Sequence, residues 1–134
     1  MMYEKELTDK LLLLLTTLGK HGMEMGEVTK VTLHETKPFR LRNYLANNFF
    51  LRIKFEVDDG GKYELMETGN PKNQEIFYLF TPDHHQYTIY IAKPATLLRH
   101  EMYAAVSPIL GDIETLYRKY AKYVLNPDDH GNPL

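Results

Sequence analysis

The spacing of the apolar residues changes twice along this chain of 134 residues, and these changes restrict the fold that it can adopt. Over residues 4–18 one apolar stripe has the spacing of an α-helix, with members at Leu7, Leu11, Leu14, Leu15 and Leu18. From residue 27, apolar and polar residues alternate, as they do in strands with one buried face. The helical spacing returns after residue 96. The predicted order is therefore helix, strands, helix.

About five strands are predicted between the two helical regions, at residues 27–34, 49–57, 62–67, 76–80 and 87–91. No helical pattern separates one strand from the next, which favours an antiparallel sheet. We expect an α+β fold in which the N-terminal helix and a long, broken C-terminal helix pack on one face of that sheet. The chain is predicted to form a single domain over residues 1–134, with residues 126–134 as a frayed tail.

Three details of this fold can be predicted. Gly19 and Gly22 should end the first helix, because glycine readily adopts a left-handed cap. In the final helix, Thr96 is the expected N-cap. There Ser107 and Pro108 predict either a kink or two helices with Ser107 capping the second.

The turn at residues 58–61 should join two strands through a three-residue loop with a glycine in the left-handed region. A two-residue loop would instead place a glutamate on the core face. The cross-strand pairs predicted for this hairpin are Val57 with Tyr63 and Phe55 with Leu65.

Composition limits the environments in which the chain is expected to act. Sixteen basic and eighteen acidic residues give a formal charge of −2, so there is no overall attraction to nucleic acid or an anionic membrane. The leucine run at residues 11–15 is far shorter than the roughly 20 residues of a membrane-spanning helix. The chain has no cysteine, which fits a reducing compartment. We expect a cytoplasmic protein that is neither exported nor membrane-bound.

Catalytic and metal-binding motifs are absent from the sequence. It has no nucleophile elbow, no glycine-rich phosphate loop and no recognisable carboxylate pair. The turn at residues 83–85 contains two histidines, but adjacent histidines on an extended segment point apart and lack metal-ligand spacing. Isolated titratable residues are more often solvated than catalytic, and this applies to His34, His100, Asp112 and Glu114. We assign no catalytic residue, metal or cofactor, and an enzyme is the third hypothesis for function.

The aromatic residues provide the leading hypothesis for the function of the chain. The chain has ten tyrosines and six phenylalanines, and the strand at residues 76–80 is apolar on both faces. If the helices cover one face of the sheet, some of these residues must lie on the other: Phe50, Ile76, Tyr78, Phe80 and Tyr90. Such a face favours a non-enzymatic protein-binding or adaptor domain, with self-association as a homodimer or binding to another protein. The alternative is that the loop at residues 37–47 or a kinked helix segment folds over this face and makes it ordinary core. Sequence alone leaves undecided which side of strand 76–80 meets the helices.

A basic segment provides the second hypothesis for function. Its basic side chains lie among aromatic residues with no acid between residues 35 and 56, and they are Lys37, Arg40, Arg42, Arg52 and Lys54. Segments of this kind bind nucleic acid or other polyanions. This hypothesis is less favoured because the chain lacks the overall basic excess of that class.

Overall fold

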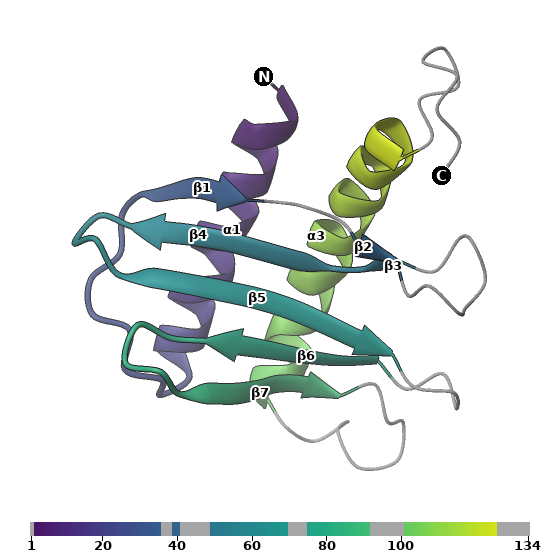
Figure 1. Cartoon of the computed structure of the whole chain (residues 1–134). Helices are drawn as coiled ribbons and strands as arrows, with labels where there is room; N and C mark the ends of the chain where they lie inside the picture. The colour runs from purple at the N-terminus through teal and green to yellow at the C-terminus, as the bar shows by residue number, and fades with distance from the viewer. Residues whose placement is uncertain (1, 36–38, 41–48, 70–74, 92–100, 126–134) are drawn as a thin grey trace.

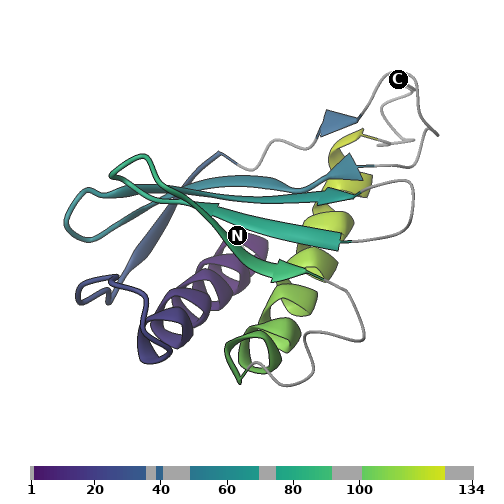
Figure 2. The same cartoon turned by 90° about the horizontal axis from the view of Figure 1, so that it is seen from below.

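The fold has two layers, a sheet and a pair of helices that lie side by side on one of its faces (Figures 1 and 2). The computed structural model describes residues 2–35, 39–40, 49–69, 75–91 and 101–125. Within these ranges the helices are α1 (Met2–Lys20) and α3 (Glu101–Leu125). The predicted α+β class, with both helices on one face of an antiparallel sheet, is confirmed.

The main sheet has five antiparallel strands in the order β1-β4-β5-β6-β7. Their bounds are β1 (Val31–Glu35), β4 (Arg52–Val57), β5 (Lys62–Gly69), β6 (Glu75–Phe80) and β7 (Gln86–Ile91). The short strands β2 (Phe39–Arg40) and β3 (Phe49–Phe50) pair separately with each other. Each neighbouring pair in the main sheet is antiparallel, as expected for strands that follow one another without intervening helices.

Helix α1 buries the predicted leucine stripe completely in the core between the layers. It ends in a Schellman cap, in which the Met23 backbone N–H donates to the Leu18 carbonyl at 3.1 Å and Gly22 donates to Gly19 at 3.2 Å. Gly22 has φ +103°, which confirms it as the left-handed cap residue. Gly19 lies inside the helix rather than beyond its end.

Helix α3 continues through Pro108, so the alternative of two separate helices is wrong. Proline removes a hydrogen bond here, but the side chains on both sides of it are anchored in the core. Val106, Ile109 and Ile113 are all buried, and this shared stripe holds the two halves in one helix. The expected N-cap, Thr96, lies outside the described residues.

The hairpin between β4 and β5 has the predicted three-residue loop, but its register differs from the prediction. Gly60 has φ +89° and donates its N–H to the Val57 carbonyl at 2.9 Å. Phe55 pairs with Tyr63 and Ile53 pairs with Leu65, so the predicted pairs are wrong by two positions. The loop begins at residue 58, earlier than those pairs require. A shift of two positions keeps the same side chains on the core face.

The parity of strand β6, undecided from sequence, is clear in the structure. Phe77 and Leu79 are buried against the helix layer, at 2% and 0% exposure. The alternate residues Ile76, Tyr78 and Phe80 point to the opposite face and are half-buried. In the described part of the chain, no helix combines the length and apolar character needed to cross a bilayer.

Candidate protein-binding face

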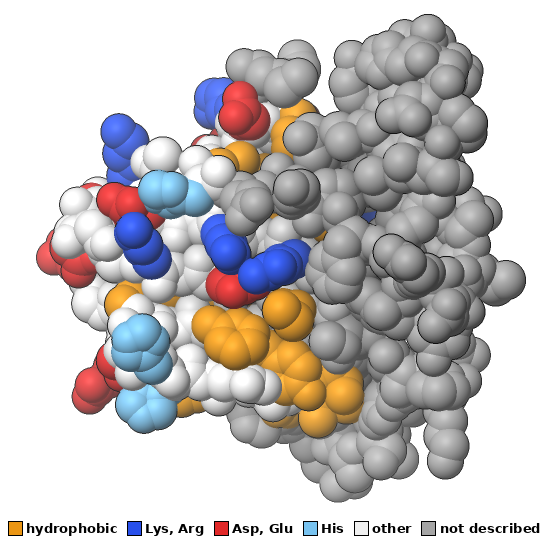
Figure 3. Space-filling model, in the orientation of Figure 1, with side chains coloured by type: hydrophobic (Ala, Val, Ile, Leu, Met, Phe, Trp, Pro, Cys, Tyr) orange, Lys and Arg blue, Asp and Glu red, His pale blue; other side chains and the backbone are white. Residues whose placement is uncertain are grey.

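The face of the sheet that points away from α1 and α3, here called the open face, divides into two halves (Figure 3). Over β6, β7 and the adjoining part of β5 lies the apolar patch, formed by Met66, Ile76, Tyr78, Phe80 and Ile91. Over β1, β4 and the start of β5 lies the charged half, which includes His34, Arg52, Lys54, Glu56, Lys62 and Glu64.

Cross-strand pairing makes the apolar patch continuous. Met66 lies opposite Tyr78, and Ile76 lies opposite Ile91. Directly opposed side chains in an antiparallel sheet are close enough to touch, so these pairs join three strands into one surface. Members of the patch are half-buried in the structure. The patch therefore presents aromatic and aliphatic surface on a face that neither helix covers.

Tyr90, which was predicted among the residues of this face, does not belong to it. Its ring contacts Phe77 and Tyr103 of the helix-facing side, with ring centroids 6.1 Å apart in both pairs. A bulge at Ile89 is the reason. Phe77 pairs with Tyr90 but Tyr78 pairs with Thr88, so one extra residue of β7 is inserted and the alternation beyond it is reversed. The same bulge brings Ile91 to the open face.

Of the other predicted interface residues, Ile76, Tyr78 and Phe80 lie together on the open face. The side chain of Phe50 lies outside the described part of the structure, although its backbone forms β3. Residues 37–47, the predicted alternative cover, are described only at positions 39–40.

The predicted basic segment is only partly described. Arg52 and Lys54 lie on β4, on the open face. Lys37 and Arg42 lie outside the described residues, as does the side chain of Arg40 in β2. Arg52 donates to Glu64 through Nε at 2.5 Å, so part of its charge is balanced within the sheet. The described basic residues alternate with acids across the strands, since Lys54 lies opposite Glu64 and Glu56 opposite Lys62.

Carboxylates also order the turns at one end of the sheet. Asp58 accepts hydrogen bonds from the Thr29 hydroxyl at 2.6 Å and from the backbone N–H groups of Thr29 and Lys30. These bonds, led by the Thr29 hydroxyl, lower the pKa of Asp58 to about 2. Asp83 accepts from Thr81 and His85, and these contacts lower its pKa as well. Burial, then the charges of Asp59 and Asp83, raise the pKa of Tyr63.

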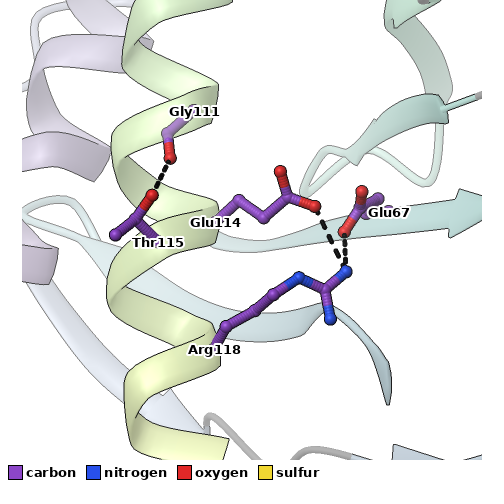
Figure 4. A network of polar contacts seen from close by, with 5 residues as sticks. All are labelled: Glu67, Gly111, Glu114, Thr115 and Arg118. Atoms are coloured by element: carbon purple, nitrogen blue, oxygen red, sulfur yellow. Dashed lines mark hydrogen bonds and ion pairs between the residues drawn. The ribbon is translucent and has the colours of Figure 1, made fainter. Parts of the chain in front are cut away.

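A buried carboxylate lies on the opposite, helix-facing side, and sequence reasoning did not identify it. Glu67 of β5 is only 4% exposed, and Arg118 of α3 reaches it at 3.5 Å (Figure 4). Arg118 also contacts Glu114 at 3.2 Å, one turn earlier on α3. Tyr63, Leu65 and Glu67 alternate along β5 and all point towards the helices. The sequence signal for this site was therefore a glutamate at a position where the alternation predicts a core residue. The cluster joins the sheet to the helix layer.

The other isolated titratable residues of the sequence are dispersed over the molecule. Asp112 forms an ion pair with Lys10 of α1 at 2.9 Å, and His34 contacts Glu56 at 2.5 Å. His100 lies outside the described residues. Among the residues that the structure describes, no group of three or more histidines and acids is arranged to hold a metal ion.

Comparison of the chain with models of known protein families, with curated proteins and with solved structures finds no significant match in any of the three.

Proposed function

We propose that this chain is a non-enzymatic protein-binding domain that forms a homodimer through the open face of its sheet. The observation that carries the proposal is the apolar patch around Tyr78, which lies on the face that neither helix covers. Aromatic residues and methionine are enriched in the cores of protein interfaces, and this patch contains both. Covering a half-buried aromatic ring removes further apolar surface from water and stabilises the complex.

Charge supports a second copy of the chain as the partner. The charged half contains three cations, Arg52, Lys54 and Lys62, and two carboxylates, Glu56 and Glu64. A face with both signs can be complementary to itself, whereas a face of one sign would repel its own copy. The formal charge of the whole chain is only −2, so long-range repulsion between two copies is small.

The edges of the sheet are less suited to association than its face. Strand β1 has an irregular register between Leu33 and Glu35, and β7 has the bulge at Ile89. Bulges at edge strands interrupt the regular backbone pairing that a second sheet would need. Association is therefore expected to occur face to face. The absence of cysteine, which fits a reducing compartment, supports a cytoplasmic location.

The experiment is size-exclusion chromatography with light scattering over a range of protein concentrations. The wild-type chain, whose mass is 15.7 kDa, should elute as a particle of twice that mass. Tyr78→Asp should shift it to the monomer because a carboxylate would be buried in the apolar interface. The matched control is Tyr87→Asp on β7, which introduces the same charge at an exposed tyrosine. Tyr87 is 41% exposed and lies opposite the core residue Leu79, so it is not on the open face, and this variant should remain a dimer.

Circular dichroism should confirm that all three proteins are folded. A wild-type chain that is monomeric at every concentration would refute the homodimer. So would a Tyr78→Asp variant that dimerises as well as the control.

Nucleic-acid or polyanion binding is the weaker hypothesis for this surface. Among the described residues, each basic position of β4 and β5 has an acid directly or diagonally opposite, so a row of phosphates would meet Glu56 and Glu64 as well as the cations.

A further inference from the structure

A shallow depression adjoins the apolar patch at the end of the sheet where its turns lie. Its volume is about 590 Å³, and the side chains that line it include His34, Lys54, Lys62, Glu64, Phe80 and Thr81. These residues come from the neighbouring strands β1, β4, β5 and β6 and from the turn after β6. From sequence, Lys54 belongs with the basic residues before it, whereas in the structure it shares this depression with Lys62 and His34.

The carboxylates around the depression already have partners within the chain. His34 contacts Glu56 and Arg52 donates to Glu64, each at 2.5 Å. In the adjacent turns, Asp59 accepts from the Gly61 backbone N–H at 2.8 Å, and Asp83 accepts from Thr81 and His85. Lys62, in contrast, makes no hydrogen bond or ion pair with any residue that the structure describes. Lys62 is therefore a cation of this depression with no direct polar contact among the described residues, although Glu56 lies opposite it in the strand pairing.

An aromatic residue, Phe80, also lines the depression. Phe80 lies directly opposite Glu64, whose carboxylate accepts the hydrogen bond from Arg52. The depression thus combines cations from β4 and β5 with an apolar wall from β6. Its volume falls within the roughly 300–1,000 Å³ of small-molecule sites.

We propose that this depression binds a small aromatic carboxylate. The carboxylate accepts a hydrogen bond from the Lys62 ammonium group, the charge of Lys54 lies in the same depression, and the ring packs against Phe80. Charge-assisted hydrogen bonds are stronger than neutral ones, and offset or edge contacts between rings add to the affinity. The neighbouring acids Glu56 and Glu64 favour a ligand with one compact negative group over an extended polyanion. The depression shares Phe80 with the apolar patch, so the ligand is expected to bind the monomer and to compete with the second copy of the chain.

The test uses phenylacetate as the probe and follows backbone amide shifts of the full chain by NMR. The shifts should be saturable and should centre on Lys62 and Phe80. Lys62→Gln should weaken binding about tenfold, the effect of losing one charge-assisted hydrogen bond. The matched control, Lys119→Gln, changes an exposed lysine of α3 and should leave binding unchanged. Titration of the Tyr78→Asp variant with phenylacetate shows whether the depression binds this ligand when the homodimer is absent.

Three results would overturn the proposal. The first is the absence of saturable shifts, or an equal loss of binding in Lys62→Gln and Lys119→Gln. The second is equal binding of inorganic phosphate at the same residues, which would show a bare anion site without recognition of the ring. The third is preferred, salt-sensitive binding of a single-stranded oligonucleotide, which would favour the polyanion hypothesis.

Discussion

The two faces of the sheet are built from the same strands, yet they differ in how their side chains are arranged. The face covered by α1 and α3 is apolar throughout its buried described positions except Glu67, which is paired with Arg118. The open face separates into an apolar patch and a charged half. This difference between the faces is the observation on which the proposed homodimer is based.

The largest expected difference between the faces concerns neighbouring residues of β6. Leu79→Ala removes a fully buried side chain from the core and should lower the free energy of unfolding by about 2–5 kcal/mol. Tyr78→Ala, on the open face, should cost less than about 1 kcal/mol when the protein is dilute enough to be monomeric. Urea denaturation at low concentration measures both. Equal costs would mean that the open face is part of the monomer's own core.

A smaller difference is expected between two ion pairs on opposite faces. Arg118→Met leaves the buried Glu67 carboxylate without its guanidinium partner and should cost about 2–3 kcal/mol. Arg52→Met breaks the pair with Glu64 on the open face, where the carboxylate side chain is 20% exposed against 5% for Glu67, and should cost about 0–1 kcal/mol. Chemical denaturation of the two variants provides the comparison. A larger loss in Arg52→Met would reverse the assignment of the covered and open faces.

The smallest expected effect is confined to acid conditions and concerns the exposed turn before β5. The pKa of Asp58 is lowered from its ordinary 3.8 to about 2. The ionised Asp58 carboxylate therefore stabilises the fold fully above pH 3.8, and this stabilisation is lost as the pH falls towards 2. Asp58→Asn should remove this dependence and reduce the loss of stability between about pH 4 and pH 2. Thermal unfolding across that range measures it. An unchanged acid profile would contradict the role of the Thr29 contact.

Most of the fold follows from the period of the apolar residues, because that period determines which side chains can be buried together. The period identified α1, the two-layer arrangement and the five strands of the main sheet. It started the first strand at residue 27 rather than at Val31, and it treated residues 49–57 as one strand where β3 and β4 belong to different sheets. It could not decide whether Phe77 or Tyr78 faces the helices, since both alternating sets of β6 are apolar and only the neighbouring strands choose between them. The structure makes that choice through the pairing of Leu65 with Leu79.

The errors at the candidate site have local causes. Strict alternation placed Tyr90 on the open face, and a single bulge at Ile89 moved it to the other. The loop between β4 and β5 was predicted with the correct length, but the prediction started it one residue too late. The predicted cross-strand pairs are therefore displaced by two positions from the observed ones. The depression at Lys62 combines the β4–β5 hairpin with His34 of β1 and Phe80 of β6, so no short motif could reveal it.

The central claim is that two copies meet through their open faces, and a distance between spin labels tests it most directly. The chain has no cysteine, so single cysteines can be introduced without other changes. The first position is Gln86, which is exposed on β7 opposite Phe80, and the second is Ala104, which is exposed on the outer surface of α3. Pulsed electron paramagnetic resonance should give a shorter distance between the spin labels of the two copies for Gln86→Cys than for Ala104→Cys. A shorter distance for Ala104→Cys, or no measurable distance between copies for either, would contradict the account.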